Sequence, residues 1–335
     1  MTTAENRVPT APPSLINALL AGFDSITNHI ELIAIPILLD VFLWLGPRLR
    51  LEGLIKRLVD QMAGLSGVGT AGVSEAWQTG QDIWYAFAER FNLFTVLRAF
   101  PVGIPSLISS SQPAATPFGA PPGMEISSGL AGLSLWIGLG LVGLVLGSLY
   151  YLIVAQASLN GRVSWREALQ QWPKAAYQVV LLAVFWVALL ATISIPASCL
   201  ITLTALSGLS IARFGLILLG GVALWMLFPL IFSAHGIFIK GMKMWASVLE
   251  SIRLTRLTFI KTSLLFACFL IISEGFDLLW RVPEETSWLT IVGIVGHAFT
   301  TTSLLAASFV YYQNSYRWIQ RLIQQAKFSS APFTT

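Results

Sequence analysis

The sequence predicts an all-α integral membrane protein with six transmembrane helices, cytoplasmic amphipathic elbow helices and a small helical extracytoplasmic cap. Three long runs, residues 126–161, 175–212 and 286–316, contain no Asp, Glu, Lys or Arg. A bilayer core needs about 20 apolar residues per spanning helix, and lipid offers backbone amides no hydrogen-bond partner, so such runs must be helical. Charged residues make up only 11% of the 335 residues, whereas soluble domains contain about 25%.

The six spanning helices follow from the apolar runs and the breaks between them. We expect them at residues 33–45, 130–154, 177–206, 214–239, 259–280 and 289–311. The chain then divides into a cytoplasmic tail with a juxtamembrane helix at 1–32, the first span at 33–45, the cap and a Pro-rich linker at 46–129, a five-helix bundle at 130–316 and a cytoplasmic tail at 317–335.

Local features of the first and later spans add two expectations. The segment from Met1 to Ser14 lacks the basic start and the cleavage site of a signal peptide, so we expect the first span to be an uncleaved anchor. Pro36, Pro196 and Pro229 lie inside spans. They predict local kinks, with the freed carbonyls bonded by neighbouring helices or polar side chains.

The orientation follows from the basic residues in the short connections. One side carries Arg162, Arg166 and Lys174; Lys240, Lys243, Arg253, Arg256 and Lys261; and Arg317, Arg321 and Lys327. The opposite short loops carry only Arg213 and Arg281. Because cytoplasmic loops are enriched in Lys and Arg, we predict that both termini are cytoplasmic. Tryptophans lie near both ends of the predicted spans, as expected for headgroup anchors.

Residues 46–129 are the part expected outside the bilayer. Apolar residues recur at helical spacing over 51–62, opposite charged ones, which predicts an amphipathic helix along the membrane surface. A glycine-rich break at 64–72 precedes a second helix at 75–97. Residues 109–128, with four prolines, predict a flexible linker back to the membrane.

Two stretches of the bundle align without gaps when Gly161 is placed on Gly241. The same register places Trp165 on Trp245 and Leu169 on Leu249. Each stretch would comprise a helix running inward, an elbow and a helix running outward, so this is a parallel rather than an inverted repeat. Chance alignment of apolar residues remains the alternative explanation.

The second elbow carries a family resemblance. Its sequence from Trp245 to Phe259, WASVLESIRLTRLTF, resembles the connecting helix of bacterial polytopic membrane proteins related to the membrane domain of glycerophosphodiester phosphodiesterases. The resemblance covers the last three spans, and the catalytic domain of that family has no counterpart here, so it implies a fold and no activity. Residues 35–48 are similar to uncharacterised membrane proteins of filamentous green bacteria, which implies lineage alone.

A glycine pattern in the second span looks like a nucleotide fingerprint. Gly138, Gly140 and Gly143 match G-x-G-x-x-G, but no strand precedes them and no ribose-binding acid follows at the right distance. Gly140, Gly143 and Gly147 instead form a small-residue stripe, which predicts close approach of another helix.

Four titratable residues inside the spans are the strongest candidates for a functional site. They are Asp40, Glu274, Asp277 and His297. Glu274 and His297 lie eleven and twelve residues from a turn near Glu285, which places both about 17 Å from it. An ionised carboxylate at the bilayer centre costs at least about 2.5–3.5 kcal/mol, so these groups need partners.

Two interpretations of this intramembrane cluster are open. In the functional one, Glu274 and His297 exchange a proton while Asp40 or Asp277 tunes the site. In the structural one, Glu274 and His297 clamp two helices, and Asp277 pairs with Arg281 four residues on. The structural interpretation is favoured, because a proton relay would need further such groups through the membrane and the third span has none.

The function predicted from these features is non-catalytic. We expect an integral membrane subunit or scaffold that packs with the lipid bilayer and with partner membrane proteins or a second copy. Anionic lipid headgroups would contact Arg253, Arg256 and Lys261. We expect no nucleic acid, cofactor or metal site, since no metal-binding spacing occurs. The alternatives are a proton- or cation-coupled transporter using the Glu/His/Asp cluster and, more weakly, a lipid enzyme.

Overall fold

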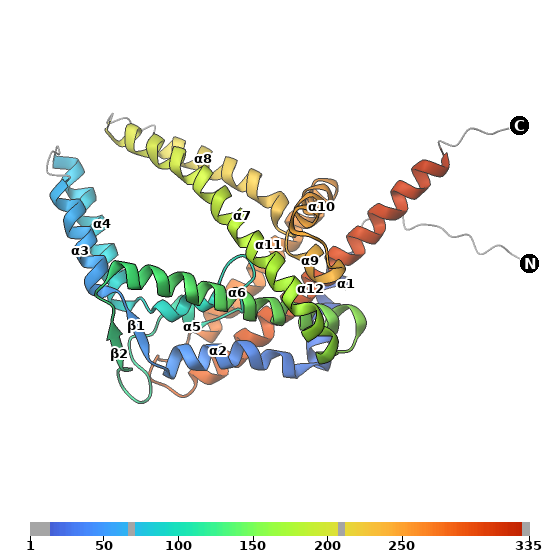
Figure 1. The fold of residues 1–335 in the computed structure, drawn as a ribbon, viewed down its shortest axis with the longest axis horizontal. Helices are drawn as coiled ribbons and strands as arrows, with labels where there is room; N and C mark the ends of the chain where they lie inside the picture. The colour runs from blue at the N-terminus through green and yellow to red at the C-terminus, as the bar shows by residue number, and fades with distance from the viewer. Residues whose placement is uncertain (1–13, 66–70, 207–211, 330–335) are drawn as a thin grey trace, which may run out of the picture. The chain divides into compact units, whose positions relative to one another are not determined.

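The computed structural model describes residues 14–65, 71–206 and 212–329, and over these it is almost entirely helical (Figure 1). The elements up to residue 125 are α1 (Leu15–Asn28), the 3-10 helix η1 (Ile30–Ile33), α2 (Ala34–Leu45), β1 (Arg48–Arg50), α3 (Glu52–Leu65), α4 (Ala71–Arg90), the 3-10 helix η2 (Leu93–Arg98), α5 (Ile108–Ser111) and β2 (Gly123–Glu125). The remaining elements are α6 (Gly129–Asn160), α7 (Trp165–Leu206), α8 (Ala212–Leu227), the 3-10 helix η3 (Phe228–Leu230), α9 (His235–Lys240), α10 (Met244–Leu257), α11 (Phe259–Trp280) and α12 (Thr290–Ser329).

Five stretches of the described chain are long and apolar enough to cross a membrane. They are Gly129–Asn160, Trp165–Cys199, Ile217–Lys240, Phe259–Trp280 and Thr290–Gln325. The pair formed by α1 and η1–α2 gives a sixth if its two broken halves count as one span. The chain is therefore an all-α, multi-pass membrane protein, as the sequence predicts.

The predicted first span differs in detail, because α2 alone has 12 residues. At 1.5 Å per residue it is about 18 Å long, short of the roughly 30 Å of a bilayer core. The helix breaks at His29, whose N–H bonds the carbonyl of Ile26 as a C-cap. Three regions with sequence predictions lie partly outside the described residues. These are the N-terminal tail at residues 1–13, the glycine-rich break at 66–70 and the C-terminal tail at 330–335.

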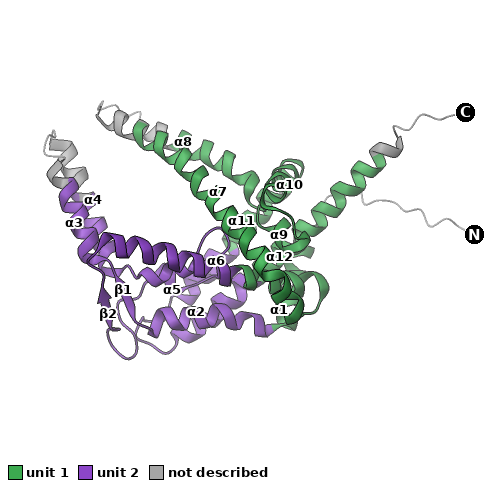
Figure 2. Ribbon diagram, viewed as in Figure 1, with its two compact units in different colours: residues 1–29, 148–271, 303–335 green, residues 30–147, 272–302 purple. Residues whose placement is uncertain are grey.

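The chain divides into two compact units (Figure 2). Unit 1 comprises residues 1–29, 148–271 and 303–335, and unit 2 comprises residues 30–147 and 272–302. Each has its own apolar core: Phe232, Leu254 and Tyr311 are fully buried in unit 1, and Trp44 and Ile294 in unit 2.

In unit 1 the predicted span 214–239 is interrupted at Pro229. The helix stops at Leu227, continues as η3 and restarts at His235. Proline cannot donate a backbone hydrogen bond and clashes with the preceding turn. The freed backbone groups bond to buried serines of α10: Ser251 Oγ donates to the carbonyl of Pro229 over 2.8 Å and accepts from the N–H of Phe232 over 3.1 Å, and Ser247 Oγ donates to the carbonyl of Ser233 over 2.6 Å. The expected kink is thus a full break, bonded by the elbow helix.

The two predicted elbows differ in form. The first is continuous with the following span in α7, which runs through Pro173 and Pro196. The second is the separate helix α10, which ends at the C-cap Thr258 before α11 begins. The elbow α10 packs a buried face that includes Ser247, Val248 and Leu254 into unit 1.

Matched backbone features occur at two aligned positions of the proposed repeat in unit 1. Gly161 and Gly241 end α6 and α9 with φ of 63° and 60°. Glycine adopts this left-handed conformation without a Cβ penalty, which makes it the common residue just past a helix end. Their N–H groups bond the carbonyls of Ala157 and Ile237, which are also aligned with each other in that register.

In unit 2 the predicted linker contains regular structure. Its residues Gly123–Glu125 form β2, which pairs in parallel with β1 so that Leu49 faces Met124. The predicted surface helix is α3, and it packs against α4. Lys56 connects the two helices through contacts with Glu52 at 2.9 Å and Glu89 at 3.2 Å.

Candidate functional site

A segment of unit 2, residues 96–107, which begins in the last residues of η2 and continues without regular structure, packs against the middle of α6. A Cβ atom on Gly143 would lie 2.4 Å from the carbonyl oxygen of Leu97, and one on Gly147 would lie 2.6 Å from that of Val102. These separations are too short for any residue but glycine. The predicted small-residue stripe therefore exists, but its partner is the backbone of this segment and not another helix. Gly140 makes only an ordinary contact with Val96.

The depth of this segment was not expected from the sequence. Gly143 lies about 21 Å along α6 from Gly129, at 1.5 Å per residue. Irregular backbone at membrane depth is tolerated only where protein or water covers it. Val102, Ser106 and Leu107 are buried accordingly. The segment that hydropathy places outside the bilayer thus packs against the middle of α6, a helix long and apolar enough to cross a membrane.

Asp40 fixes the end of this segment. The fully buried carboxylate accepts from the backbone N–H of Leu107 over 2.9 Å, from that of Ile108 over 3.1 Å, and from the hydroxyl of Ser106. It therefore bonds the free donors at the start of α5. A carboxylate that accepts several hydrogen bonds can remain in a buried site.

Asp277 and His297 join α11 to α12 within unit 2. His297 Nδ1 donates to Asp277 Oδ1 over 2.7 Å, and both side chains are buried. Arg281 Nη2 approaches Asp277 Oδ2 at 3.5 Å and donates to Ser110 Oγ over 2.9 Å. The carboxylate thus lies between a histidine and an arginine. Asp40 is within electrostatic range of His297.

Two glycines allow α12 to approach the end of α11 this closely. A Cβ atom on Gly293 would lie 2.4 Å from the carbonyl oxygen of Trp280, and one on Gly296 would lie 2.6 Å from the Trp280 ring. Any larger residue would push the helices apart and lengthen the Asp277–His297 contact. The functional relevance of these glycines was missed from sequence, where only the stripe on α6 was noted.

Glu274 takes a different place from the one expected. The sequence analysis pairs it with His297, whereas the structure brings Asp277 to His297 and leaves Glu274 exposed on α11. Glu274 and Asp277 lie about 4.5 Å apart along α11 and about 60° apart around it, and this offset brings Asp277 rather than Glu274 to His297. All four predicted site residues belong to unit 2, but only Asp40, Asp277 and His297 are buried and lie near one another, while Glu274 is exposed.

Further polar contacts connect the 281–289 turn of unit 2 to residues 113–114. Glu285 accepts from the N–H of Ala114 over 2.7 Å through its side chain and from the indole of Trp44 over 3.3 Å through its carbonyl. Arg48 donates to the carbonyls of Pro113 and, over 3.3 Å, Ala114. Burial and the nearby Arg50 lower the pKa of Arg48, and Glu285 opposes this shift; a guanidinium stays charged at neutral pH.

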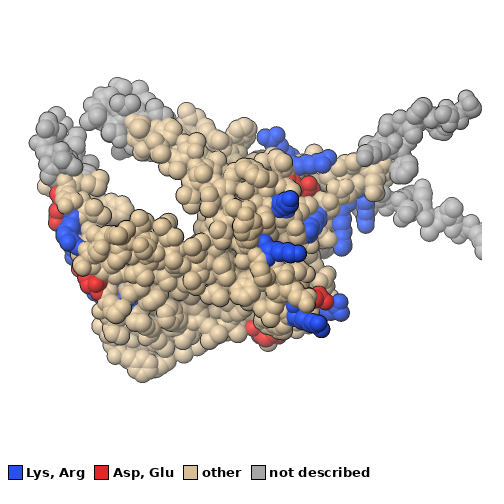
Figure 3. Space-filling model, in the orientation of Figure 1, with Lys and Arg blue, Asp and Glu red and all other residues tan. Residues whose placement is uncertain are grey.

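In unit 1 the titratable groups inside the spans are fewer. His235 Nε2 donates to Ser308 Oγ over 2.9 Å, and Ser308 in turn donates to the carbonyl of Leu305 over 2.6 Å. The predicted lipid contacts Arg253, Arg256 and Lys261 are exposed around α10. On the face drawn in Figure 3, Lys and Arg gather over this part of unit 1 with few acidic side chains among them.

Among the described residues no group of three His, Cys, Asp or Glu side chains is placed to hold a metal ion. Cys199 and Cys268 are free thiols. No family model, no curated protein and no solved structure matches the chain. The resemblance of the second elbow to phosphodiesterase membrane domains therefore remains a prediction.

Proposed function

We propose that this protein is a non-catalytic integral membrane subunit or scaffold that packs against partner membrane proteins and lipids. The observation that carries the proposal is the low burial of three spans. Only 22%, 22% and 17% of the spans in α7, in α8–α9 and in α11 are buried, against 44% and 61% for those in α6 and α12. Helices that a small bundle leaves this open are available for partners, because a spanning helix packs wherever its surface finds a matching one.

Glu274 adds a specific reason for a protein partner. It lies on the exposed face of α11 between Leu270 and Leu278, which are 64% and 76% exposed. A carboxylate facing lipid this far inside a span is costly. A partner helix with a hydrogen-bond donor would remove that cost, and a purely lipid-facing surface would not.

The buried charges support a structural rather than a transport role. Asp40, Asp277 and His297 each bond neighbours within unit 2. The described parts of α7 and α8 contribute no acidic or histidine side chain to a path beyond Glu167 at the start of α7. The charge distribution supports a cytoplasmic (inner) membrane location in a bacterium, with both termini cytoplasmic.

Native mass spectrometry of the protein, extracted gently from its own membrane, tests this proposal. We expect a stoichiometric membrane partner, and we expect the Glu274→Gln variant to lose it while a Glu167→Gln control on the first elbow retains it. A protein that stays alone in both mild detergent and native lipid particles would contradict the subunit function.

A proton-coupled transporter is the second candidate, favoured by the direct Asp277–His297 hydrogen bond inside two spanning helices. Proton flux into liposomes that contain the purified protein tests it. Flux that is abolished by Asp277→Asn and kept by Glu274→Gln would establish this function with Asp277 in the place predicted for Glu274. The absence of flux in the unaltered protein would dismiss it.

A further inference from the structure

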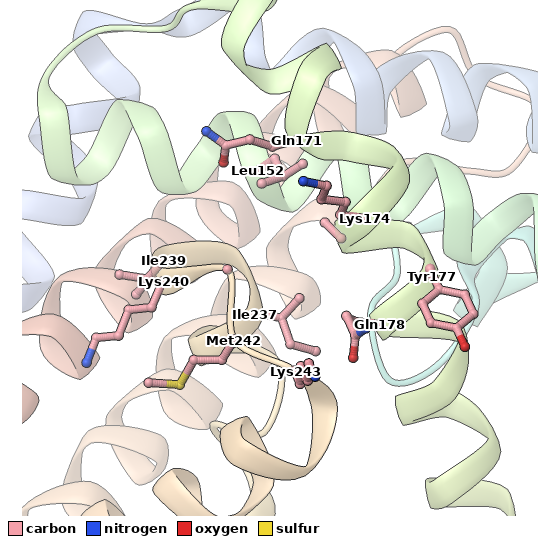
Figure 4. Close-up of a pocket in the computed structure, with 12 residues that line it drawn as sticks. Leu152, Gln171, Lys174, Tyr177, Gln178, Ile237, Ile239, Lys240, Met242 and Lys243 are labelled. Carbon is pink, nitrogen blue, oxygen red and sulfur yellow. The ribbon is translucent and has the colours of Figure 1, made fainter.

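A cavity of about 670 Å³ lies within unit 1. Its walls come from α6, α7, α9 and the loop 241–243 (Figure 4). Apolar side chains, including Leu152, Ile237 and Met242, form one part of the lining. Polar side chains that include Gln171, Lys174, Tyr177, Gln178 and Lys243 form the other part. The cavity is therefore amphiphilic, and no acidic residue lines it.

Two lysines give this cavity its charge. Lys174 on α7 and Lys243 at the start of α10 are both exposed, and neither ammonium group forms an ion pair or hydrogen bond with a described residue. Figure 4 shows Lys174 and Gln171 on one side of the cavity and Lys243 beside Gln178 on the other. Two unpaired ammonium groups facing one opening repel each other unless an anion lies between them.

A third lysine, Lys240, has a different role. Its side chain is directed away from Lys174 and Lys243 in Figure 4. Its ammonium group lies over the ring of Tyr316, a cation–π contact, and Glu250 lies within electrostatic range. Lys240 is therefore engaged with Tyr316 inside unit 1, and the two other lysines remain for a ligand.

The local backbone holds the two lysines in place. Gln178, one turn after Lys174, accepts from the N–H of Met244 over 2.8 Å and so fixes the start of α10 beside α7. Gly241 turns the chain between α9 and α10 in the left-handed conformation. Lys243 is the N-cap residue of the 14-residue α10, and the partial positive charge of a helix N-terminus adds to that of the two ammonium groups.

The position along the spans points to the headgroup layer. Lys240 ends the candidate span Ile217–Lys240, and Lys174 borders the apolar run of α7. We propose that this cavity binds a phosphate-bearing anion, with the phosphate between Lys174 and Lys243 and the attached apolar stem against Leu152 and Ile237. Lysine ammonium groups bind phosphate as point charges, while the Gln171 amide and the Tyr177 hydroxyl supply further donors. The source of the phosphate is either a phospholipid headgroup or a soluble phosphate compound.

The inference does not depend on the subunit function, because a lone protein would hold the same anion. The test uses the purified full chain, delipidated in detergent, with native mass spectrometry during titration with phosphatidic acid, phosphatidylglycerol or phosphatidylcholine. We expect one anionic phospholipid to bind with high affinity and its affinity to fall roughly tenfold or more in the Lys174→Gln/Lys243→Gln double variant.

The matched control removes two exposed arginines of the first elbow, Arg162→Gln/Arg166→Gln, and so the same net charge. Equal losses in the control and in the lysine variant would overturn the proposal, because they would show a general charge effect. A charge-conserving Lys174→Arg/Lys243→Arg variant should retain binding. This variant keeps the test valid if the glutamine variant fails to fold.

Inorganic phosphate and glycerol 3-phosphate distinguish the two sources. If millimolar amounts displace the bound anionic lipid and protect Lys174 from an amine-reactive reagent, the cavity accepts a soluble phosphate compound. If only the lipid protects Lys174, the ligand is a membrane phospholipid. If neither the lipids nor the soluble phosphates protect Lys174 or Lys243, the cavity is not a phosphate site and the proposal is wrong.

Discussion

The two units handle charge in opposite ways. Unit 1 carries 13 of the 20 basic residues but only 4 of the 16 acidic ones, and unit 2 carries the remainder. In unit 2 several acidic groups form contacts inside the unit. Asp40 accepts from backbone donors, Asp277 pairs with His297, and Glu52 and Glu89 both pair with Lys56. In unit 1 the break in α8–α9 is bonded by neutral serines, and the lysines and arginines whose side chains are described are exposed, apart from Lys240, which is partly buried against Tyr316.

The difference teaches that buried charge in a membrane protein need not mark a transport path. In unit 2 carboxylates replace missing backbone partners of an irregular segment at membrane depth. In unit 1 hydroxyl groups do the same for a proline break, which leaves the charged groups free to meet ligands. A satisfied buried charge is thus a structural device, whereas an unpaired exposed one is available for binding.

The largest effect is expected from removal of the Asp40 carboxylate. Asp40→Ala leaves two backbone donors of the 106–108 segment without partners, so we expect the free energy of unfolding to fall by about 3–5 kcal/mol. Unfolding of the purified protein by titration with SDS measures it. Ser106→Ala removes one donor to Asp40 and leaves the N–H of Ser109 without its 3.0 Å acceptor, so it orphans one backbone group against two and should cost less; equal losses would show that Asp40 does not hold the segment.

A smaller loss is expected where the segment meets α6. Gly143→Ala places a Cβ atom against the carbonyl of Leu97, so we expect a loss of about 1–3 kcal/mol from overpacking. The control is Gly138→Ala in the same helix, where no atom lies within 4 Å of the added Cβ atom. That variant should gain stability, because alanine favours a helix over glycine by about 1 kcal/mol. Equal behaviour of the two variants in the SDS titration would contradict the close packing.

The corresponding test in unit 1 is Ser251→Ala. It orphans the buried N–H of Phe232 and the carbonyl of Pro229, so we expect a loss of about 1–2 kcal/mol. Hydrogen exchange of the Phe232 amide should increase with it. Ser194→Ala on the exposed face of α7 is the control, because Ser194 bonds only the carbonyl of Ala191 in its own helix. If Ser251→Ala leaves exchange at Phe232 unchanged, the break does not depend on the elbow.

The smallest effect is expected at the exposed ion pairs of α3 and α4. Hydrogen bonds to Glu52 and Glu89 raise the pKa of Lys56 above its ordinary value of 10.5. A raised pKa means that this contribution to stability is fully present below pH 10.5 and is lost as the pH rises through the higher folded value. NMR titration of the Lys56 side chain measures the shift, and Glu52→Gln should reduce it. High salt should weaken the contact, because exposed ion pairs are screened. A Lys56 pKa at or below 10.5 would contradict the contact.

Much of the fold was predictable because lipid imposes a simple rule. Charge-free runs must be helices, so five of the six predicted spans appear, and the sixth appears as a broken pair. The span Phe259–Trp280 has the predicted boundaries, whereas Trp165–Cys199 begins twelve residues before the predicted start and Thr290–Gln325 ends fourteen after the predicted end. The break at Pro229 was expected only as a kink, because the sequence does not show that Ser247 and Ser251 would bond the freed backbone.

The candidate site was only half predictable. Hydropathy identified Asp40, Asp277 and His297 as costly intramembrane groups, and helix length placed Glu274 and His297 at matching depth. The choice of Asp277 over Glu274 depends on the rotation of α11 against α12, which the Gly293 and Gly296 contacts with Trp280 determine. No pattern in a single sequence reports that rotation.

The sequence by itself determined the membrane class, the number of apolar runs and the uneven distribution of charge, because each depends on composition along the chain. Only the tertiary structure decided that residues 96–107 lie against α6, that Asp40 bonds this segment, and that Lys174 and Lys243 line one cavity. These contacts join residues that are distant in sequence. They depend on shape and on hydrogen-bond direction, which local hydrophobicity does not encode.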